Sequence, residues 1–167
     1  MFKKYAVFTS ILGALSFCLQ AQVKFAELLP SAKQYTTSGE VLELPQTITI
    51  QSDAESKAQA VLLQYYIEKV SLYGAAMLSP SQSALISLKM TTSAAVDREA
   101  YTITVSKTKI EVTSATQEGL TNGALTVAQL TQKAILSGQP IECGVIQDAR
   151  RFGWRGMHLD VSRHFFE

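Results

Sequence analysis

The sequence predicts an α+β fold, a two-layer sandwich in which two helices lie against one mostly antiparallel sheet. Two stretches, 52–74 and 116–138, repeat apolar residues at helical spacing, and strand-like stretches precede, separate and follow them. The predicted order of strand, helix, three strands, helix, strand is typical of helices packed on a single sheet. With 47% hydrophobic residues among 167, the chain can form one modest core, or one domain and the beginning of another.

The first predicted helix follows two short strands at 41–44 and 47–50. Ser52 and Glu55 fit a capping box at its start, and Gly74 fits a stop at its end. Its apolar stripe is wide, so we expect the helix to cover the sheet. The residues expected to face the core are Ala58, Val61, Leu62, Tyr65 and Tyr66.

The clearest strand pair is a hairpin at 101–106 and 109–113, in which apolar residues alternate with polar ones. A further strand at 84–90 precedes it, and a last strand spans 141–146. The alternation predicts one buried and one wet face for this part of the sheet.

The second predicted helix begins near Thr116, with Glu118 suited to the positive end of the helix dipole, and it ends at Gly138. The residues expected to be buried are Leu120, Ala124, Val127, Ala128, Ala134 and Ile135.

The N-terminus has the pattern of a signal peptide spanning residues 1–21. Lys3 and Lys4 form a short positive region, and the apolar run that follows is too short for a membrane span. Ala21 is the small residue expected before the cleavage site, so we expect an exported protein, periplasmic or secreted. A lipid anchor at Cys18 is the less favoured alternative, because a large aromatic residue precedes it.

Charge and residue types argue against several kinds of site. The formal net charge is +1 and the sequence has no basic stripe, which argues against nucleic acid as a partner. His158 and His164 stand six residues apart and far from Cys143, a spacing that does not make a metal site. We therefore expect no metal and no cofactor, and we expect Cys143 to be a small buried residue in a strand.

A connector, Asp148 to Gly153, follows the last strand of the predicted domain at 22–150. It is charged, contains glycine and has no hydrophobic period. After it, Met157, Leu159 and Val161 alternate with other residues as in a new strand. This strand would begin a second domain, and because no partner element follows it, we expect the chain to be incomplete.

Three local patterns occur in order along the chain. The first is Glu99-Ala100-Tyr101-Thr102-Ile103, the second is G-L-T-N-G-A-L-T-V-A-Q-L at 119–130, and the third is I-Q-D-A-R-R-F-G-W-R-G-M-H-L-D-V-S-R-H-F-F at 146–166. Together they resemble the leading α+β domain and the barrel entry of β-N-acetylhexosaminidases of glycoside hydrolase family 20. Arg150, Glu167 and Val127 depart from the usual Pro, Pro and Leu of that family. The resemblance implies that residues 151–167 are the start of a TIM-barrel, (β/α)8, catalytic domain that is truncated here.

The resemblance also implies an activity for the full-length protein. Enzymes of this family remove terminal non-reducing β-linked N-acetylglucosamine or N-acetylgalactosamine from glycans with retention, and the substrate's own acetamido oxygen is the nucleophile. An adjacent Asp-Glu pair supplies the acid and orients the acetamido group. No Asp in this sequence is followed by Glu. We therefore expect no catalytic residue in this chain and no hydrolysis by the chain as given.

Arg155 is the residue that the resemblance assigns to substrate binding, because the Arg of the W-R-G step holds hydroxyls of the terminal sugar. A guanidinium offers several fixed donors for such a task. The resemblance places Asp160, Arg163 and His164 in support of the sugar pocket, near the carboxyl end of the first barrel strand. The alternative for all four is a structural cluster of ion pairs, for instance between Arg155 and Asp148 or Asp160.

Two other interpretations stay open. A related family with a similar leading domain, such as α-glucuronidases or family 84 enzymes, is disfavoured by the pattern from Arg155 to Phe166. A non-catalytic exported carbohydrate-binding or interaction module would need a row of exposed aromatic residues or an apolar patch, and the sequence shows neither.

Overall fold

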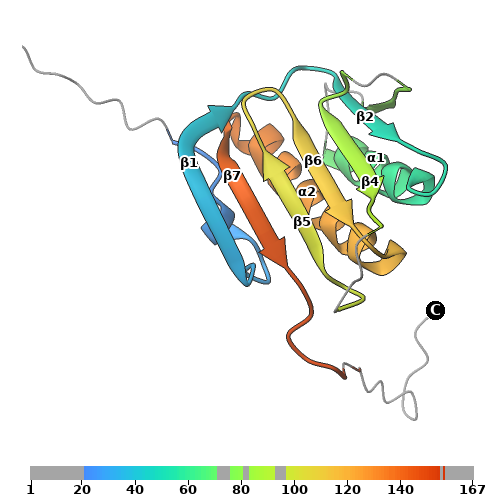
Figure 1. Cartoon of the computed structure of the whole chain (residues 1–167). Coiled ribbons are helices and arrows are strands. Elements are labelled where there is room, and N and C mark those ends of the chain that lie inside the picture. Colours follow the sequence, from blue (N-terminus) through green and yellow to red (C-terminus); the bar gives the residue numbers. More distant parts are fainter. Residues whose placement is uncertain (1–20, 71–75, 81–82, 93–96, 155, 157–167) are drawn as a thin grey trace, which may run out of the picture.

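A computed structural model of the chain describes residues 21–70, 76–80, 83–92, 97–154 and 156. In these residues a seven-stranded sheet with the order β1-β7-β5-β6-β4-β2-β3 carries both helices on one face (Figure 1). This confirms the predicted α+β class. The elements are η1 (Phe25–Glu27), β1 (Gln34–Leu42), β2 (Ile48–Ser52), α1 (Lys57–Val70), β3 (Ala76–Leu78), β4 (Ile86–Met90), β5 (Tyr101–Val105), β6 (Ile110–Ser114), α2 (Gln117–Ser137) and β7 (Ile141–Asp148).

The sheet is mixed rather than mostly antiparallel. Three pairs are antiparallel: β1 with β7, β7 with β5, and β5 with β6, the last being the predicted hairpin. The other three pairs are parallel: β6 with β4, β4 with β2, and β2 with β3. Helix α1 follows β2 as the crossover that returns the chain to the same end of the sheet, so that β3 pairs parallel to β2. Antiparallel pairing was therefore predicted correctly only for the half of the sheet that contains the hairpin.

Helix α2 begins and ends where the sequence indicated. The Thr116 side chain accepts a hydrogen bond from the Gly119 N–H at 3.0 Å, and Gly138 ends the helix in the left-handed conformation, with φ 64°. Glu118 lies in the first turn. The predicted inner face is buried except for Ile135, which is half-buried and packs against the core.

Two glycines bring α2 unusually close to the sheet. A Cβ on Gly119 would lie 2.2 Å from the Ala100 carbonyl oxygen and 2.3 Å from Ser114 Oγ. A Cβ on Gly123 would lie 2.5 Å from Val112 Cγ1. The helix can therefore contact β5 and β6 at these points only because both side chains are absent.

Helix α1 differs from the prediction in its cap. The capping box is formed by Asp53 and Ser56 rather than by Ser52 and Glu55. The Asp53 N–H donates to Ser56 Oγ at 3.0 Å, and the Ser56 N–H donates to Asp53 Oδ1 at 2.7 Å. Ser52 is the last residue of β2.

The buried face of α1 also differs from the predicted one. Its buried residues are Gln59, Ala60, Leu63 and Ile67. Val61 and Tyr65 of the predicted face are 48% and 52% exposed. The buried Gln59 contacts α2 through its amide nitrogen, which donates to Gln117 Oε1 at 2.7 Å and to Thr121 Oγ1 at 3.2 Å.

The N-terminal segment is attached to β7. Val23 forms a parallel bridge with Ile141, and the Phe25 N–H donates to Glu142 Oε1. Both Phe25 and Glu142 are buried. Cys143 is a free, buried cysteine, as predicted, and burial raises the pKa of its thiol.

Helix length and side-chain clustering bear on membrane crossing and metal binding in the described part of the chain. Within it, neither helix combines the length and the apolar character needed to cross a membrane. Within the same residues there is no group of three or more His, Cys, Asp or Glu side chains placed to hold a metal ion. Cys18 and most of the predicted signal peptide, residues 1–20, lie outside the described residues.

Candidate functional site

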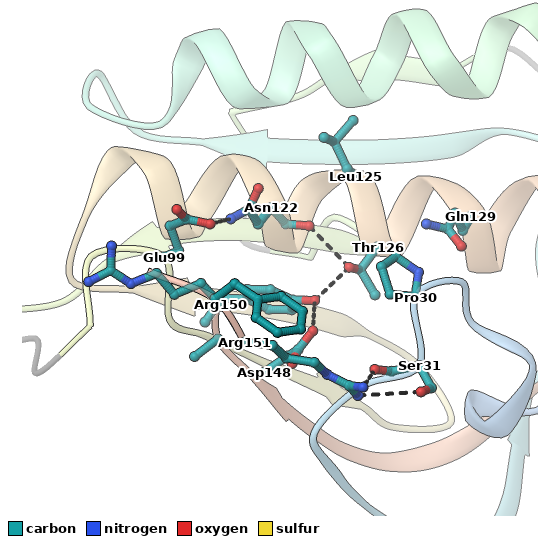
Figure 2. Close-up of a pocket in the computed structure, with 13 residues that line it drawn as sticks. Pro30, Ser31, Glu99, Asn122, Leu125, Thr126, Gln129, Asp148, Arg150 and Arg151 are labelled. Carbon is teal, nitrogen blue, oxygen red and sulfur yellow. Dashed lines mark hydrogen bonds between the residues drawn. The ribbon is translucent and has the colours of Figure 1, made fainter. Parts of the chain in front are cut away.

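A cleft of about 470 Å³ lies where the chain leaves β7, between α2, the segment after η1 and the connector (Figure 2). Four separate stretches of the chain contribute to its wall. The lining residues are Pro30, Ser31, Glu99, Tyr101, Asn122, Leu125, Thr126, Gln129, Asp148, Ala149, Arg150, Arg151 and Phe152.

Tyr101 forms the floor of the cleft. Its ring is buried, and its hydroxyl lies 2.7 Å from Thr126 Oγ1 and donates to Asp148 Oδ2 at 3.1 Å. Thr126 Oγ1 also lies within hydrogen-bond distance of the Asn122 carbonyl oxygen, at 3.1 Å. Burial raises the pKa of the Tyr101 hydroxyl well above its usual range, and the nearby Asp148 carboxylate adds to the shift. Tyr101 is therefore a neutral hydrogen-bond donor at physiological pH.

The two carboxylates of the cleft already have partners. Asp148 accepts the Tyr101 hydroxyl on one oxygen and the Lys33 N–H, at 3.1 Å, on the other. Glu99 lies 3.4 Å from the Asn122 amide nitrogen (Figure 2). Neither carboxylate stands beside a nucleophile in this cleft. The arrangement is suited to holding the connector in place rather than to general acid–base chemistry.

Two large apolar side chains near the cleft are exposed to solvent. Phe152 is 69% exposed and Trp154 is 84% exposed. Isolated exposed apolar residues are common on protein surfaces. Here both belong to the short stretch that leads out of the domain.

The residues that the resemblance assigned to sugar binding, Arg155, Asp160, Arg163 and His164, lie outside the described residues. Their roles stay predictions. Asp148, considered as an ion-pair partner of Arg155, has both oxygens bonded to groups of its own domain.

Sequence reasoning missed the cleft. The alternation at 101–106 predicts Tyr101 on the buried face of the hairpin, and its ring is indeed buried. The available signal was the tyrosine within the pattern at 99–103, because a residue specified as Tyr rather than Phe indicates a role for the hydroxyl. Thr126 occupies the threonine position of the second pattern, and Asp148 the aspartate position of the third.

Comparison with known proteins gives a family match over most of the chain. Residues 26–149 match the family model described as glycosyl hydrolase family 20, domain 2. The chain is 40% identical over 72 residues to a beta-hexosaminidase of Akkermansia muciniphila, an alignment covering 42% of this chain and 14% of that protein.

Solved structures show the same fold. An N-acetyl-beta-hexosaminidase of Streptomyces plicatus, solved in complex with Thio-NAglucal, superposes with a TM-score of 0.72 at 22% identity. That match covers 85% of this chain and 30% of the other. A GH20 exo beta-N-acetylglucosaminidase of Vibrio harveyi, in complex with N-acetylglucosamine, gives a TM-score of 0.69 at 22% identity, over 89% of this chain and 23% of the other. The chain thus spans less than a third of the length of each of these relatives.

Proposed function

The chain belongs to glycosyl hydrolase family 20, and we propose that it is the N-terminal part of an exported β-N-acetylhexosaminidase. The complete protein would hydrolyse terminal non-reducing β-linked N-acetylhexosamine residues. The observation that carries this proposal is the family match over 26–149, which contains all seven strands and both helices. The relatives that the chain resembles are beta-hexosaminidases, and one is solved with N-acetylglucosamine bound.

In the proposed mechanism the substrate assists its own hydrolysis. The acetamido oxygen attacks the anomeric carbon, a Glu protonates the leaving oxygen, and the preceding Asp orients the acetamido group. The printed sequence has no adjacent Asp-Glu pair, so these two residues would come from sequence beyond position 167. The domain described above would serve as the scaffold on which the catalytic part is built.

Arg155 is our proposed substrate-binding residue. Its guanidinium would donate to hydroxyls of the terminal sugar, and Asp160, Arg163 and His164 would support the pocket around it. A guanidinium suits this task because it stays charged and presents several donors in a fixed plane. These assignments rest on the W-R-G-M-H-L-D-V-S-R-H pattern at 154–164.

The proposal is tested by expressing the complete protein and measuring release of p-nitrophenol from the β-N-acetylglucosaminide and the β-N-acetylgalactosaminide. We expect hydrolysis of both or of one, and a loss of at least about 100-fold in kcat/KM for Arg155→Ala, as for a buried hydrogen-bonding group at a sugar. Arg98→Ala is the matched control, because Arg98 is an exposed arginine that pairs with Glu118 on the surface.

The two negative outcomes have different meanings. A folded complete protein that binds N-acetylglucosamine but hydrolyses neither substrate would favour the non-catalytic binding module. Near-normal kinetics of Arg155→Ala in an active enzyme would remove Arg155 from the sugar pocket while leaving the activity assigned.

We also propose that the protein is exported, periplasmic or secreted, with the mature chain beginning at Gln22. The support is the sequence pattern of residues 1–21. N-terminal sequencing of the protein from culture medium and periplasm is expected to begin at Gln22. Recovery of the chain with Lys3 and Lys4 intact in the cytoplasm would contradict export.

A further inference from the structure

The connector carries two successive arginines where the chain leaves the domain. Arg150 and Arg151 are exposed and lie in irregular backbone beyond the end of β7. Phe152 and Trp154, which follow them, are exposed as well. All seven strands and both helices of the described residues end at or before Asp148. A break in the chain just after the arginine pair would therefore leave each of these elements whole.

An exposed arginine in irregular backbone is what a protease of the trypsin type requires. Such a protease inserts a basic side chain of its substrate into a pocket with an aspartate at its base. Sites of proteolytic nicking concentrate in exposed segments outside helices and strands. In the connector the side chain of Arg151 would enter the pocket, so the bond cut would be the one between Arg151 and Phe152.

Contacts with residues 29–33, which we name the guard segment, engage the groups that a protease has to bind. Arg151 Nη2 donates to the Ser31 carbonyl oxygen at 2.6 Å and lies 3.4 Å from Ser31 Oγ (Figure 2). Lys33 Nζ donates to the Arg150 carbonyl oxygen at 2.7 Å. While these bonds persist, neither the arginine side chain nor the carbonyl group before it is free for a protease.

The guard segment is attached to the body of the domain. Ala32 is buried in the core, and the side-chain amide of Gln129 on α2 accepts the Leu29 N–H at 3.2 Å and donates to the Leu29 carbonyl oxygen at 2.9 Å. A second element, the turn before β5, also contacts the connector, because Arg150 Nε lies 3.4 Å from Asp97 Oδ1. Two separate elements thus hold the connector against the domain.

The guarding contacts are polar and lie at the surface, so they can open while the domain stays folded. Hydrogen bonds and ion pairs between exposed groups each add little to stability. Segments that are held in this way open locally, without unfolding of the core. A protease would reach the connector only in the fraction of molecules in which these contacts are broken.

From these observations we propose that the bond between Arg151 and Phe152 is a cleavage site for a protease of trypsin-like specificity, guarded by the contacts just described. The reaction is hydrolysis, for which the protease supplies the catalytic groups. Water adds across the amide bond and leaves a carboxylate on Arg151 and a free amine on Phe152. Cleavage separates the N-terminal domain from the rest of the protein, and the guarding contacts set its rate.

The test treats the complete protein with trypsin under native conditions and follows this cut by mass spectrometry. A synthetic peptide of residues 146–154 gives the rate for the unguarded bond. We expect the bond to be cut at least about tenfold more slowly in the protein, because the rate follows the population of open molecules. A protein cut as fast as the peptide would overturn the guard.

Variants that break one guarding contact should be cut faster than the wild type. Lys33→Met removes the bond to the Arg150 carbonyl oxygen, and Asp97→Asn removes the charge that faces the Arg150 side chain. Each is expected to raise the rate about two- to fivefold, as for the loss of one exposed contact. Thermal midpoints should stay within about 2 °C of the wild type, which shows that the domain itself is still folded.

Matched controls change charged side chains elsewhere on the domain. Lys107→Met breaks an exposed pair with Glu40, and Glu118→Gln breaks an exposed pair with Arg98. Both are expected to be cut at the wild-type rate. Arg151→Gln removes the side chain that enters the protease pocket, so the cut before Phe152 should disappear. A cut before Phe152 that persists in Arg151→Gln would overturn the assignment of the site.

The remaining outcomes are equally decisive. Resistance of this bond in the wild type and in both opened variants would overturn the cleavage site, because the connector would then be inaccessible in the complete protein. Equal acceleration in the opened variants and in the controls would overturn the guard. None of these measurements uses glycosidase activity, so the inference stands or falls independently of the proposed function.

Discussion

Replacing Gly119 by alanine tests whether the close approach of α2 to the sheet is essential for stability. The added Cβ would lie 2.2 Å from the Ala100 carbonyl oxygen and 2.3 Å from Ser114 Oγ. A carbon and an oxygen need about 3.3 Å between them, so the first turn of α2 or the start of β5 must move by about an ångström. Backbone atoms cannot turn aside as the end of a side chain can.

The expected magnitude follows from three terms. Overpacking of a tight contact costs about 1–3 kcal/mol, and loss of the 2.8 Å hydrogen bond from Ser114 Oγ to the Ala100 carbonyl oxygen costs about 1 kcal/mol. Replacing glycine in a helix returns up to about 1 kcal/mol. We therefore expect Gly119→Ala to lower the free energy of unfolding by about 2 kcal/mol.

The assay is urea unfolding of the purified protein, followed by circular dichroism, with the midpoint and slope fitted separately. Gly123→Ala should cost less, because its nearest neighbour is a valine side chain that can rotate. Gly153→Ala is the control, because no atom lies within 4 Å of the added Cβ. A Gly119→Ala protein as stable as the Gly153→Ala protein would refute the reasoning, because the close contact of α2 with the sheet would then add no cost.

Three further predictions concern polar groups that form hydrogen bonds within the fold. Tyr101→Phe should lower the free energy of unfolding by about 1–2 kcal/mol at pH 7. The pKa of Tyr101 is raised in the folded state, so the stability that its neutral hydroxyl contributes is fully present below about pH 10 and is lost as the pH rises further. The Tyr101→Phe protein should lack this part of the alkaline loss of stability. Glu142→Ala should release the segment around Phe25, measured as faster amide exchange there, and unchanged exchange would contradict an anchoring role. Asp53→Ala should lower the free energy of unfolding by about 1 kcal/mol, and Ser52→Ala by clearly less. The reverse order in chemical unfolding would show that Ser52 caps the helix, as expected from sequence.

Helix α2 could be predicted almost completely because its signals agree with each other. Thr116, Glu118 and Gly138 mark its ends, and its apolar residues form one stripe. Helix α1 has a possible capping side chain at both Ser52 and Asp53, and apolar residues around much of its surface. Its phase is decided by packing on α2, where Gln59 finds a polar partner, and that information is absent from the local sequence.

The sheet shows the same division between local and distant contacts. The hairpin of β5 and β6 was predictable because the two strands are neighbours in sequence and alternate clearly. The parallel pairs of β4 with β6 and with β2 join strands that are distant in sequence. Hydrophobic alternation indicates that a strand exists but not which strand lies beside it.

The candidate site could be predicted only in part, and for a related reason. The cleft is assembled from four stretches of chain, so no single stretch reveals it. Arg155 was predicted from a motif and lies outside the described residues, so its role stays a prediction. Residues 29–33 carry no recognisable motif. Lys33 and Ser31 contact the connector largely through backbone groups, which sequence patterns do not reveal.

The three patterns that identify the family meet at one place in the fold. Gly119 of the second pattern contacts Ala100 of the first, and the hydroxyl of Tyr101 lies between Thr126 of the second pattern and Asp148 of the third. None of these contacts requires a substrate. What the patterns specify together is a close fit of α2 on β5 and a fixed exit for the chain at the end of β7. The resemblance in sequence is therefore, in this domain, a resemblance in how the connector is held.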